Sequence, residues 1–448
     1  MIRTGRPGRT VTRPGTGGTL LGVCLLFLTA IALPARPARA QAPAGTVYVM
    51  SNVGHVAGAN SILGFRRDAA GRLTLFGEFA TRGTGTHPTP NLDVPESLGT
   101  FDVDQPLIIN RAGTRLFAVN SGSDTIAVFN VRRNGALAHV AGSPFPSGGG
   151  QPVSVGLAAN ETILAVANKD YDLGRSGFNP ALRRPNYTTL RVTPQGRLLP
   201  IPRATIVADP DGGFGPGSPN PTQMLVAHDV ARQGRRVNPS GRLVFDVDFF
   251  GLMIHSFALR PNGRLVPVQS QMLPSSESPV PGINSFGLPI PLGQQVHPTQ
   301  PVLYLGQVLD QKLAVYTYDA AGRFQFVRSL PGAGDGICWF VTNAAGTRLY
   351  SANNFDNSVA VFDISDAQNP VKLQNFSLAD PDGLAFQIAI DPAGQFLHVI
   401  SQRGADSQPA EANALHVLQL GGDGRVTAQT DRITLPIAPS RSQGVVAR

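Results

Sequence analysis

Residues 113–137 read GTRLFAVNSGSDTIAVFNVRRNGAL, and this stretch decides the fold. A turn leads into an apolar, β-forming run that ends in a polar residue, and a second apolar run and a hairpin with glycine follow. The same pattern occurs seven times, at residues 45–73, 113–137, 161–198, 241–265, 300–324, 346–371 and 394–426. Repeated four-stranded units stack radially into a propeller, which leaves only short, protected sheet edges. We therefore predict an all-β, seven-bladed β-propeller of four-stranded antiparallel blades.

Each blade also needs an innermost strand ahead of the two apolar runs. Six candidates stand in the expected places, at residues 105–110, 151–157, 233–238 (QGRRVN), 292–297, 336–343 and 385–390. The seventh candidate, SQGVVAR at 442–448, is the last segment of the chain, whereas the first repeat begins directly at Gly45. We expect this last strand to join the N-terminal blade and to close the ring.

The first forty residues have the pattern of a secretory signal peptide. Basic residues lead into an apolar segment at 20–33, and Ala38-Arg39-Ala40 is a small-x-small cleavage site. We predict a signal peptide at 1–40, a propeller at 41–448 and a secreted or periplasmic location. A retained membrane anchor is the alternative reading of this segment.

Charge and cysteine content also depend on the leader. It holds six of the 37 basic residues and no acidic one, so the mature chain carries 31 bases against 29 acids. No basic stripe with interleaved aromatic residues is present, which argues against a nucleic-acid partner. Cleavage leaves Cys338 as the sole cysteine, so no intramolecular disulfide can form. We expect a monomer without a membrane span after cleavage.

Loop lengths predict two unlike faces. Turns between the first and second strands of a blade, and between the third and fourth, are short and rich in Asn, Asp and Gly. The surplus residues fall at 53–60, 83–104, 170–185, 209–230, 270–291 and 403–413. These connections all emerge at the same end of the blades, which we call the decorated face; the opposite end is the trim face. Long loops on a rigid scaffold commonly carry function, although passive decoration is the alternative.

Polar residues end the second strand of every repeat: Asn52, Asn120, Asn168, Asp248, Gln307, Asn353 and Ser401. Such residues either bond their own turns or offer donors and acceptors to a ligand at the channel mouth. Asp248 is the one ionisable member, which suits an acid–base role better than a carboxylate metal cage. We expect no cofactor and leave open a weak Ca²⁺ site among these oxygens.

The segment AHDVARQGRR at 227–236 is the densest cluster of chemically active residue types. His228 and Asp229 could move a proton, and Arg232 and Arg235 could hold an anionic ligand. A surface loop with ordinary charges is the alternative. Glutamine opens several predicted inner strands, at Gln105, Gln151, Gln233 and Gln443.

The repeats resemble YVTN-type propeller repeats, and the mature chain is similar to the seven-bladed lactonase family. That family includes bacterial 6-phosphogluconolactonase and fungal carboxymuconate cyclase. NPSGRLVFDVDFFG at 238–251 is similar to the family's S-P-D-G-R-x-L-F-V-P-D-L-G stretch and places Asp248 on the family's Asp. Two positions depart from the family: Gln233 stands where Pro-His is common, and Gln307-Val308 replaces Asn-Glu.

The resemblance implies hydrolysis or isomerisation of a small lactone or sugar acid. Asp248 and His228 would then be catalytic, and the substrate would be bound by Arg232, Arg235, Gln233, Asn120, Asn168, Gln307 and Asn353. The alternative is a non-catalytic extracytoplasmic propeller that binds a protein, a glycan or an envelope component.

Overall fold

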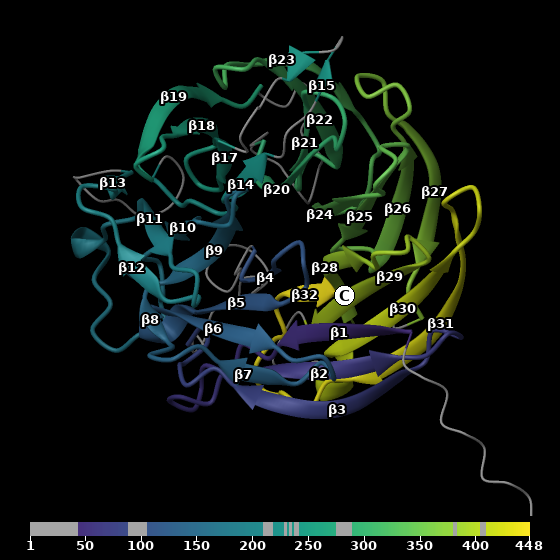
Figure 1. Ribbon diagram of the computed structural model, residues 1–448. Helices are drawn as coiled ribbons and strands as arrows, with labels where there is room; N and C mark the ends of the chain where they lie inside the picture. Colours follow the sequence, from purple (N-terminus) through teal and green to yellow (C-terminus); the bar gives the residue numbers. More distant parts are fainter. Residues whose placement is uncertain are drawn as a thin grey trace, which may run out of the picture. The chain divides into compact units, whose positions relative to one another are not determined.

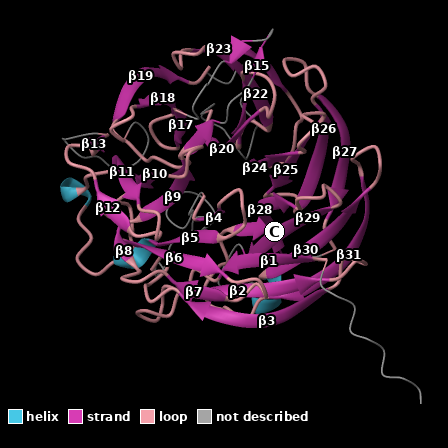
Figure 2. Cartoon of the chain, viewed as in Figure 1, coloured by secondary structure: helices cyan, strands magenta, loops and turns pink. Residues whose placement is uncertain are grey.

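The computed structural model describes residues 44–87, 105–208, 218–227, 231–232, 235–236, 242–274, 289–379, 383–403 and 409–448. The predicted signal peptide lies outside these residues. The described residues form seven sheets with four strands each along a continuous hydrogen-bonded path, arranged around a central axis in Figure 1. Helical structure in this part of the chain is confined to three short 3₁₀ turns, η1 (Ser121–Ser123), η2 (Pro180–Leu182) and η3 (Ala410–Ala412) (Figure 2). The predicted seven-bladed, all-β fold is confirmed.

From the channel outward, the first blade consists of β32 (Val445–Ala447), β1 (Gly45–Met50), β2 (Ser61–Arg67) and β3 (Leu73–Ala80). The second blade consists of β4 (Leu107–Ile109), β5 (Arg115–Asn120), β6 (Thr125–Val131) and β7 (Leu137–His139). The third blade consists of β9 (Pro152–Leu157), β10 (Ile163–Asn168), β11 (Asn186–Val192) and β12 (Leu198–Pro200). Two short strands extend these sheets, with β8 (Phe145–Pro146) on β6 and β13 (Ile206–Val207) on β11.

Blades four to seven consist of β14 (Leu225–Ala227), β17 (Leu243–Asp248), β18 (Met253–Leu259) and β19 (Leu265–Met272); β20 (Pro291–Val296), β21 (Val302–Gln307), β22 (Lys312–Tyr318) and β23 (Phe324–Leu330); β24 (Ile337–Thr342), β25 (Arg348–Asn353), β26 (Ser358–Asp363) and β27 (Val371–Ser377); and β28 (Gly383–Ile390), β29 (Phe396–Arg403), β30 (Ala414–Leu420) and β31 (Val426–Thr434). A separate hairpin pairs β15 (Ala231–Arg232) with β16 (Arg235–Arg236).

The second strand of each blade is buried on both faces, and the fourth is half exposed. In β5, Leu116–Val119 are all at most 1% exposed, because the blade packs against a neighbour on either side. In β3 only Leu73 is buried and the other seven residues are half-buried or exposed, because this strand lies at the outer edge of the blade. The strong apolar runs of the sequence therefore mark the middle of each blade.

The innermost strand of the fourth blade differs from the prediction. We expected residues 233–238, but β14 holds this place and pairs with β17 through Leu225↔Phe245 and Ala227↔Leu243. The inner strand packs between neighbouring blades, and Leu225, Val226 and Ala227 are 8% exposed or less. An arginine pair would place charge in that contact without a partner, whereas the short apolar triplet fills it.

The last strand closes the ring as predicted. β32 pairs antiparallel with β1 through Val47↔Ala447, Tyr48↔Val446 and Val49↔Val445, so purple β1 lies beside yellow β32 in Figure 1. Further backbone hydrogen bonds flank the ladder, from Thr46 N to Arg448 O (2.9 Å) and from Met50 N to Gly444 O (3.0 Å). The first blade therefore depends on both ends of the chain.

Deleting residues 443–448 should lower the melting temperature by at least about 5 °C, because it removes the ladder to β1 and exposes the apolar inner face of the first blade. Differential scanning calorimetry measures this change. Replacing the same six residues with a Gly-Ser segment is the matched control and should melt like the deletion. An unchanged melt in both variants would contradict closure by β32.

Candidate functional site

The polar residues that end the second strands lie at the decorated face, and all seven are buried with exposed fractions of 0–4%. Their side chains hold loops to strand ends. Asn120 Oδ1 accepts hydrogen bonds from Thr81 Oγ1 (2.6 Å) and Asn60 Nδ2 (2.9 Å). Other members of the ring join strands within one blade, through hydrogen bonds of Asn168 with Asn186, Gln307 with Ser329, and Asn353 with Ser358. These bonds give the ring a structural role, and direct ligand binding by its amides stays a prediction.

Asp248 ends β17 and is only 2% exposed. Its Oδ1 accepts hydrogen bonds from the backbone N–H groups of Asn220 and Gly251, both at 2.7 Å. A Cβ on Gly251 would lie 2.7 Å from the Asp248 carboxyl carbon, so this turn requires glycine. Among the described residues, none donates a hydrogen bond to Oδ2.

Burial raises the pKa of Asp248 to about 6, although the two N–H donors and the nearby positive charges of Lys169 and Arg183 act in the opposite direction. Both cations are buried, at 0% and 1% exposure. A carboxyl group that titrates near neutrality can both donate and accept a proton. Asp248 therefore has the electrostatic setting of an acid–base group.

Lys169 and Arg183 belong to residues 169–185, between β10 and β11, which we call the bridging loop. Arg183 lies near one end of this loop, and its guanidinium donates to Asp170 O at the other end (2.8 Å). It also donates to Pro219 O (2.8 Å), which precedes the fourth blade. The same guanidinium lies 4.4 Å from the ring centroid of Tyr171, and the Tyr171 ring contacts Phe250 at 5.6 Å. The bridging loop is thus packed against the fourth blade beside Asp248.

A second charged group forms where the bridging loop meets the connection between the first two blades. His87 Nδ1 and Asp172 Oδ2 lie 2.6 Å apart, and the His87 side chain is 28% exposed while that of Asp172 is 2% exposed. The hydrogen bond to the carboxylate raises the pKa of His87 against the effect of burial. A histidine held through one ring nitrogen by a buried carboxylate presents its other nitrogen as a base.

Arg175 ties this pair to the second blade. Its guanidinium makes two hydrogen bonds to the carboxylate of Asp124, at 2.6 and 2.9 Å, and its Nε lies 3.8 Å from Asp172 Oδ2. Gly122 allows the imidazole to approach, because a Cβ there would lie 2.8 Å from His87 Cε1. Segments from the first three blades thus fix the orientation of His87.

The predicted cluster at 227–236 has a different position from the one expected. His228 and Gln233 lie outside the described residues, and their predicted roles stay predictions. Arg232 and Arg235 pair with each other in the β15–β16 hairpin. This hairpin belongs to the connection between β14 and β17, which begins and ends at the trim face, whereas Asp248 ends β17 at the decorated face. The inner strand beside which this cluster was expected is β14 instead, and substrate binding by Arg232 and Arg235 stays a prediction.

The His87–Asp172 pair was not predicted from the sequence. His87 could be placed on a decorated loop, but Asp172 lies 85 residues further along and no local pattern connects the two. Asp248 was found because it ends a recognisable strand. In the described residues, no group of three or more His, Cys, Asp or Glu side chains is close enough to hold a metal ion, and no helix there has the length and hydropathy of a membrane span.

Comparisons with known proteins show which propellers this architecture is similar to. Residues 293–434, which cover blades five to seven, match the family model "Lactonase, 7-bladed beta-propeller". Over these three blades the chain is similar to the lactonase propeller family. This confirms the family resemblance inferred from the repeats. No curated protein sequence matches the chain.

Solved structures share the lactonase-type propeller fold at low sequence identity. The periplasmic gluconolactonase of Pseudomonas aeruginosa aligns with a TM-score of 0.57 and 16% identity, over 89% of this chain and 98% of that one. A candidate 6-phosphogluconolactonase from Bacteroides uniformis aligns with a TM-score of 0.61 and 16% identity, over 89% and 98%. A Lactobacillus plantarum protein aligns with a TM-score of 0.61 and 15% identity, over 90% and 98%. His87, Asp172 and Asp248 precede the segment that matches the family model.

The substitution Asp248→Asn tests the electrostatics of the buried carboxyl. Its pKa is raised from 3.8 to about 6 in the folded state, so the native protein binds the extra proton and the wild type loses stability as pH rises from about 4 to 6. A neutral Asn lacks this loss but can still accept the two backbone hydrogen bonds. We expect the stability of Asp248→Asn relative to wild type to increase by about 2 kcal/mol between pH 4 and pH 7. Urea denaturation at several pH values measures the difference, and parallel curves would contradict the raised pKa.

Proposed function

We propose that this chain is a lactone hydrolase that acts on a small lactone or related sugar acid at the decorated face. The observation that carries the proposal is the 2.6 Å contact between half-buried His87 and buried Asp172 on a lactonase-type propeller. Hydrolysis of a cyclic ester needs a base to activate water and a proton donor for the departing oxygen. The decorated face supplies candidates for both.

In this proposal His87 acts as the base. Asp172 accepts a hydrogen bond from Nδ1–H, which leaves Nε2 unprotonated and able to take a proton from water as the water oxygen attacks the lactone carbonyl. The resulting tetrahedral intermediate collapses with cleavage of the ring C–O bond. Addition of one water to the lactone gives one hydroxy acid, and no oxidant or cofactor is consumed.

Asp248 is proposed as the group that exchanges a proton with the ring oxygen. Its raised pKa keeps part of the population protonated near neutral pH, and Oδ2 is available for such an exchange among the described residues. Lys169 and Arg183 would stabilise the carboxylate that remains after the proton is given away.

We also propose that the protein works outside the cytoplasm. The support is the leader at 1–40, with its basic start, apolar segment and small-x-small site. A structural neighbour is described as a periplasmic gluconolactonase, which is compatible with this location. Detecting the mature protein with Gln41 at its N-terminus in the periplasmic or culture fraction would test the proposal. Finding only the full-length precursor in the membrane fraction would contradict it.

A panel of aldonolactones assayed by pH-stat tests the reaction. We expect turnover by the wild type and a drop in kcat/KM of about 10²–10⁴-fold for His87→Ala, because general-base catalysis contributes about this factor. His55→Ala is the matched control, since His55 is an exposed histidine whose described hydrogen-bond partner is a serine hydroxyl, Ser440 Oγ, 3.0 Å from its Nδ1. It should retain wild-type activity.

The pH dependence of activity distinguishes His87 acting as the base from a purely structural role of His87. Only neutral His87 can accept a proton, so activity should rise with pH through an apparent pKa above the ordinary 6.5, and Asp172→Asn should move this limb to lower pH. Loss of activity in His228→Ala with full activity in His87→Ala would assign the base to His228 instead. No turnover of any lactone by the wild type would reject the hydrolase and favour a binding propeller.

A further inference from the structure

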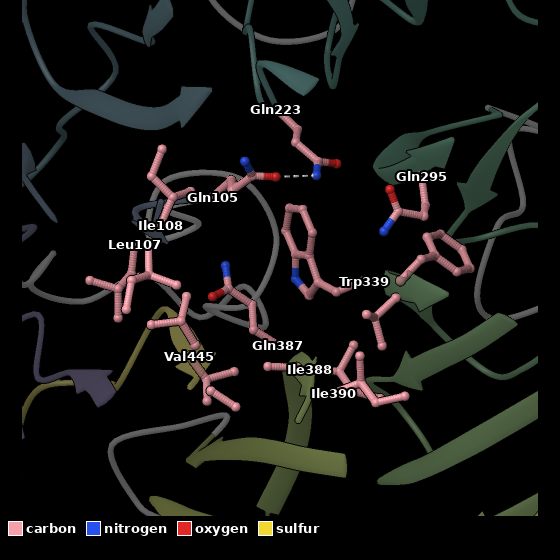
Figure 3. A pocket seen from close by; sticks show the side chains of 16 residues that line it. Gln105, Leu107, Ile108, Gln223, Gln295, Trp339, Gln387, Ile388, Ile390 and Val445 are labelled. Carbon is pink, nitrogen blue, oxygen red and sulfur yellow. Dashed lines mark hydrogen bonds between the residues drawn. The ribbon is translucent and has the colours of Figure 1, made fainter. Parts of the chain in front are cut away.

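The central channel contains a cavity of about 310 Å³ that the proposed reaction does not use. It is lined by residues of the inner strands β4, β20, β24, β28 and β32, and Figure 3 shows its side chains. This volume is at the lower end of the range of small-molecule sites, about 300–1,000 Å³. The cavity is therefore large enough for a compact ring.

Polar and apolar groups are segregated along the channel. Gln105, Trp339 and Gln387 come before the apolar ends of their strands, so the amide and indole groups lie nearer the decorated face. The apolar side chains beyond them, such as Ile109 and Ile390, lie nearer the trim face. None of the sixteen lining residues, all of them described, carries an ionisable side chain.

Two of the amides are fixed by their own hydrogen bonds and cannot reorient freely. Gln223 Nε2 donates to Gln105 Oε1 (2.8 Å), the dashed line in Figure 3. Gln105 Nε2 donates to Val155 O (3.0 Å), and Gln223 Oε1 accepts the backbone N–H of Gln294 (2.7 Å). These bonds fix one side of the polar section.

Two donors facing the cavity have no acceptor among the residues that the structure describes. Trp339 is 4% exposed, and its buried indole Nε1–H has no partner among the described residues. The ring is held edge-to-face against Phe386 at 5.8 Å and projects among the glutamines in Figure 3. Gln295 Oε1 accepts the N–H of Val296 (3.1 Å), and its Nε2 donates to no residue in the described part of the chain.

We propose that the channel is a binding site for a small, uncharged molecule whose oxygen accepts hydrogen bonds from Trp339 Nε1 and Gln295 Nε2. Both unused groups are donors, so the ligand must supply an acceptor such as a carbonyl or ester oxygen. The apolar walls take up its hydrocarbon part. A carboxylate or phosphate is excluded, because no lining residue could compensate for its lost hydration. This site is distinct from the charged residues around His87 and does not depend on turnover.

The single tryptophan of the chain provides a direct readout. In protein labelled with ¹⁵N-tryptophan, the one indole N–H signal reports whether Trp339 gains an acceptor. Cyclohexanone is a suitable probe, since it is uncharged, carries one carbonyl and cannot be hydrolysed. Cyclohexanecarboxylate is the matched charged probe. We expect a saturable downfield shift with cyclohexanone and none with the carboxylate.

Variants locate the probe in the channel. Gln295→Leu removes one donor and should weaken binding about 5–10-fold, the usual effect of one hydrogen bond. Ile390→Phe fills the apolar section without touching either donor and should abolish the shift while the indole signal persists. Ile108→Phe, across the channel, serves the same purpose if Ile390→Phe lowers the melting temperature.

Several outcomes would overturn the proposal. These are no saturable shift up to the solubility of cyclohexanone, equal binding of the carboxylate, or an unchanged shift in a correctly folded cavity-filling variant. Unchanged affinity in Gln295→Leu would remove Gln295 as a donor and overturn the two-donor site.

Discussion

The backbone pairing of β32 with β1 is the constraint on which the whole ring depends. A propeller sector without its inner strand would leave the edge of β1 open and its apolar face uncovered. The ladder at Val47–Val49 and the flanking bonds of Thr46 and Met50 use backbone groups, and Val445 buries its side chain in the core beside them, so closure needs both extended geometry and apolar side chains. With the ring closed, each blade packs between two neighbours, and loops from different blades are brought together at the decorated face.

The bridging loop holds residues of neighbouring blades in fixed positions and so forms a defined site. One segment of the third blade contacts the first through Asp172, the second through Arg175, and the fourth through Arg183. The residues that hold it are themselves charged, so the loop carries buried cations and carboxylates beside the strand ends. Buried charges of this kind cost free energy unless they are paired, and their pKa values shift as a result. The contact with Asp172 raises the pKa of His87, whereas burial raises the pKa of Asp248 against the loop's positive charges.

The sequence allows the ring and its closure to be predicted because these depend on local, repeated patterns. Alternating apolar runs mark the second and third strands in every copy, and the unmatched segment at the C-terminus implies a shared blade. The fourth inner strand was missed because Leu225–Ala227 is too short to show an alternating pattern of apolar residues. Residues 233–238 were predicted in its place because they begin with glutamine, like several other predicted inner strands. Asp248 was predictable as a strand end. The His87–Asp172 pair was not, because only ring closure and the bridging loop bring these distant residues together.

The shared first blade also determines the order in which the propeller can fold. Residues near 47 pair with residues near 446, and this pairing has the greatest sequence separation among the described strand pairs. A ribosome that has made six blades has still produced an open arc with an uncovered sheet edge. Closure becomes feasible only once residues 445–447 have left the ribosome. Until then the open arc carries an unpaired sheet edge, a feature that promotes aggregation.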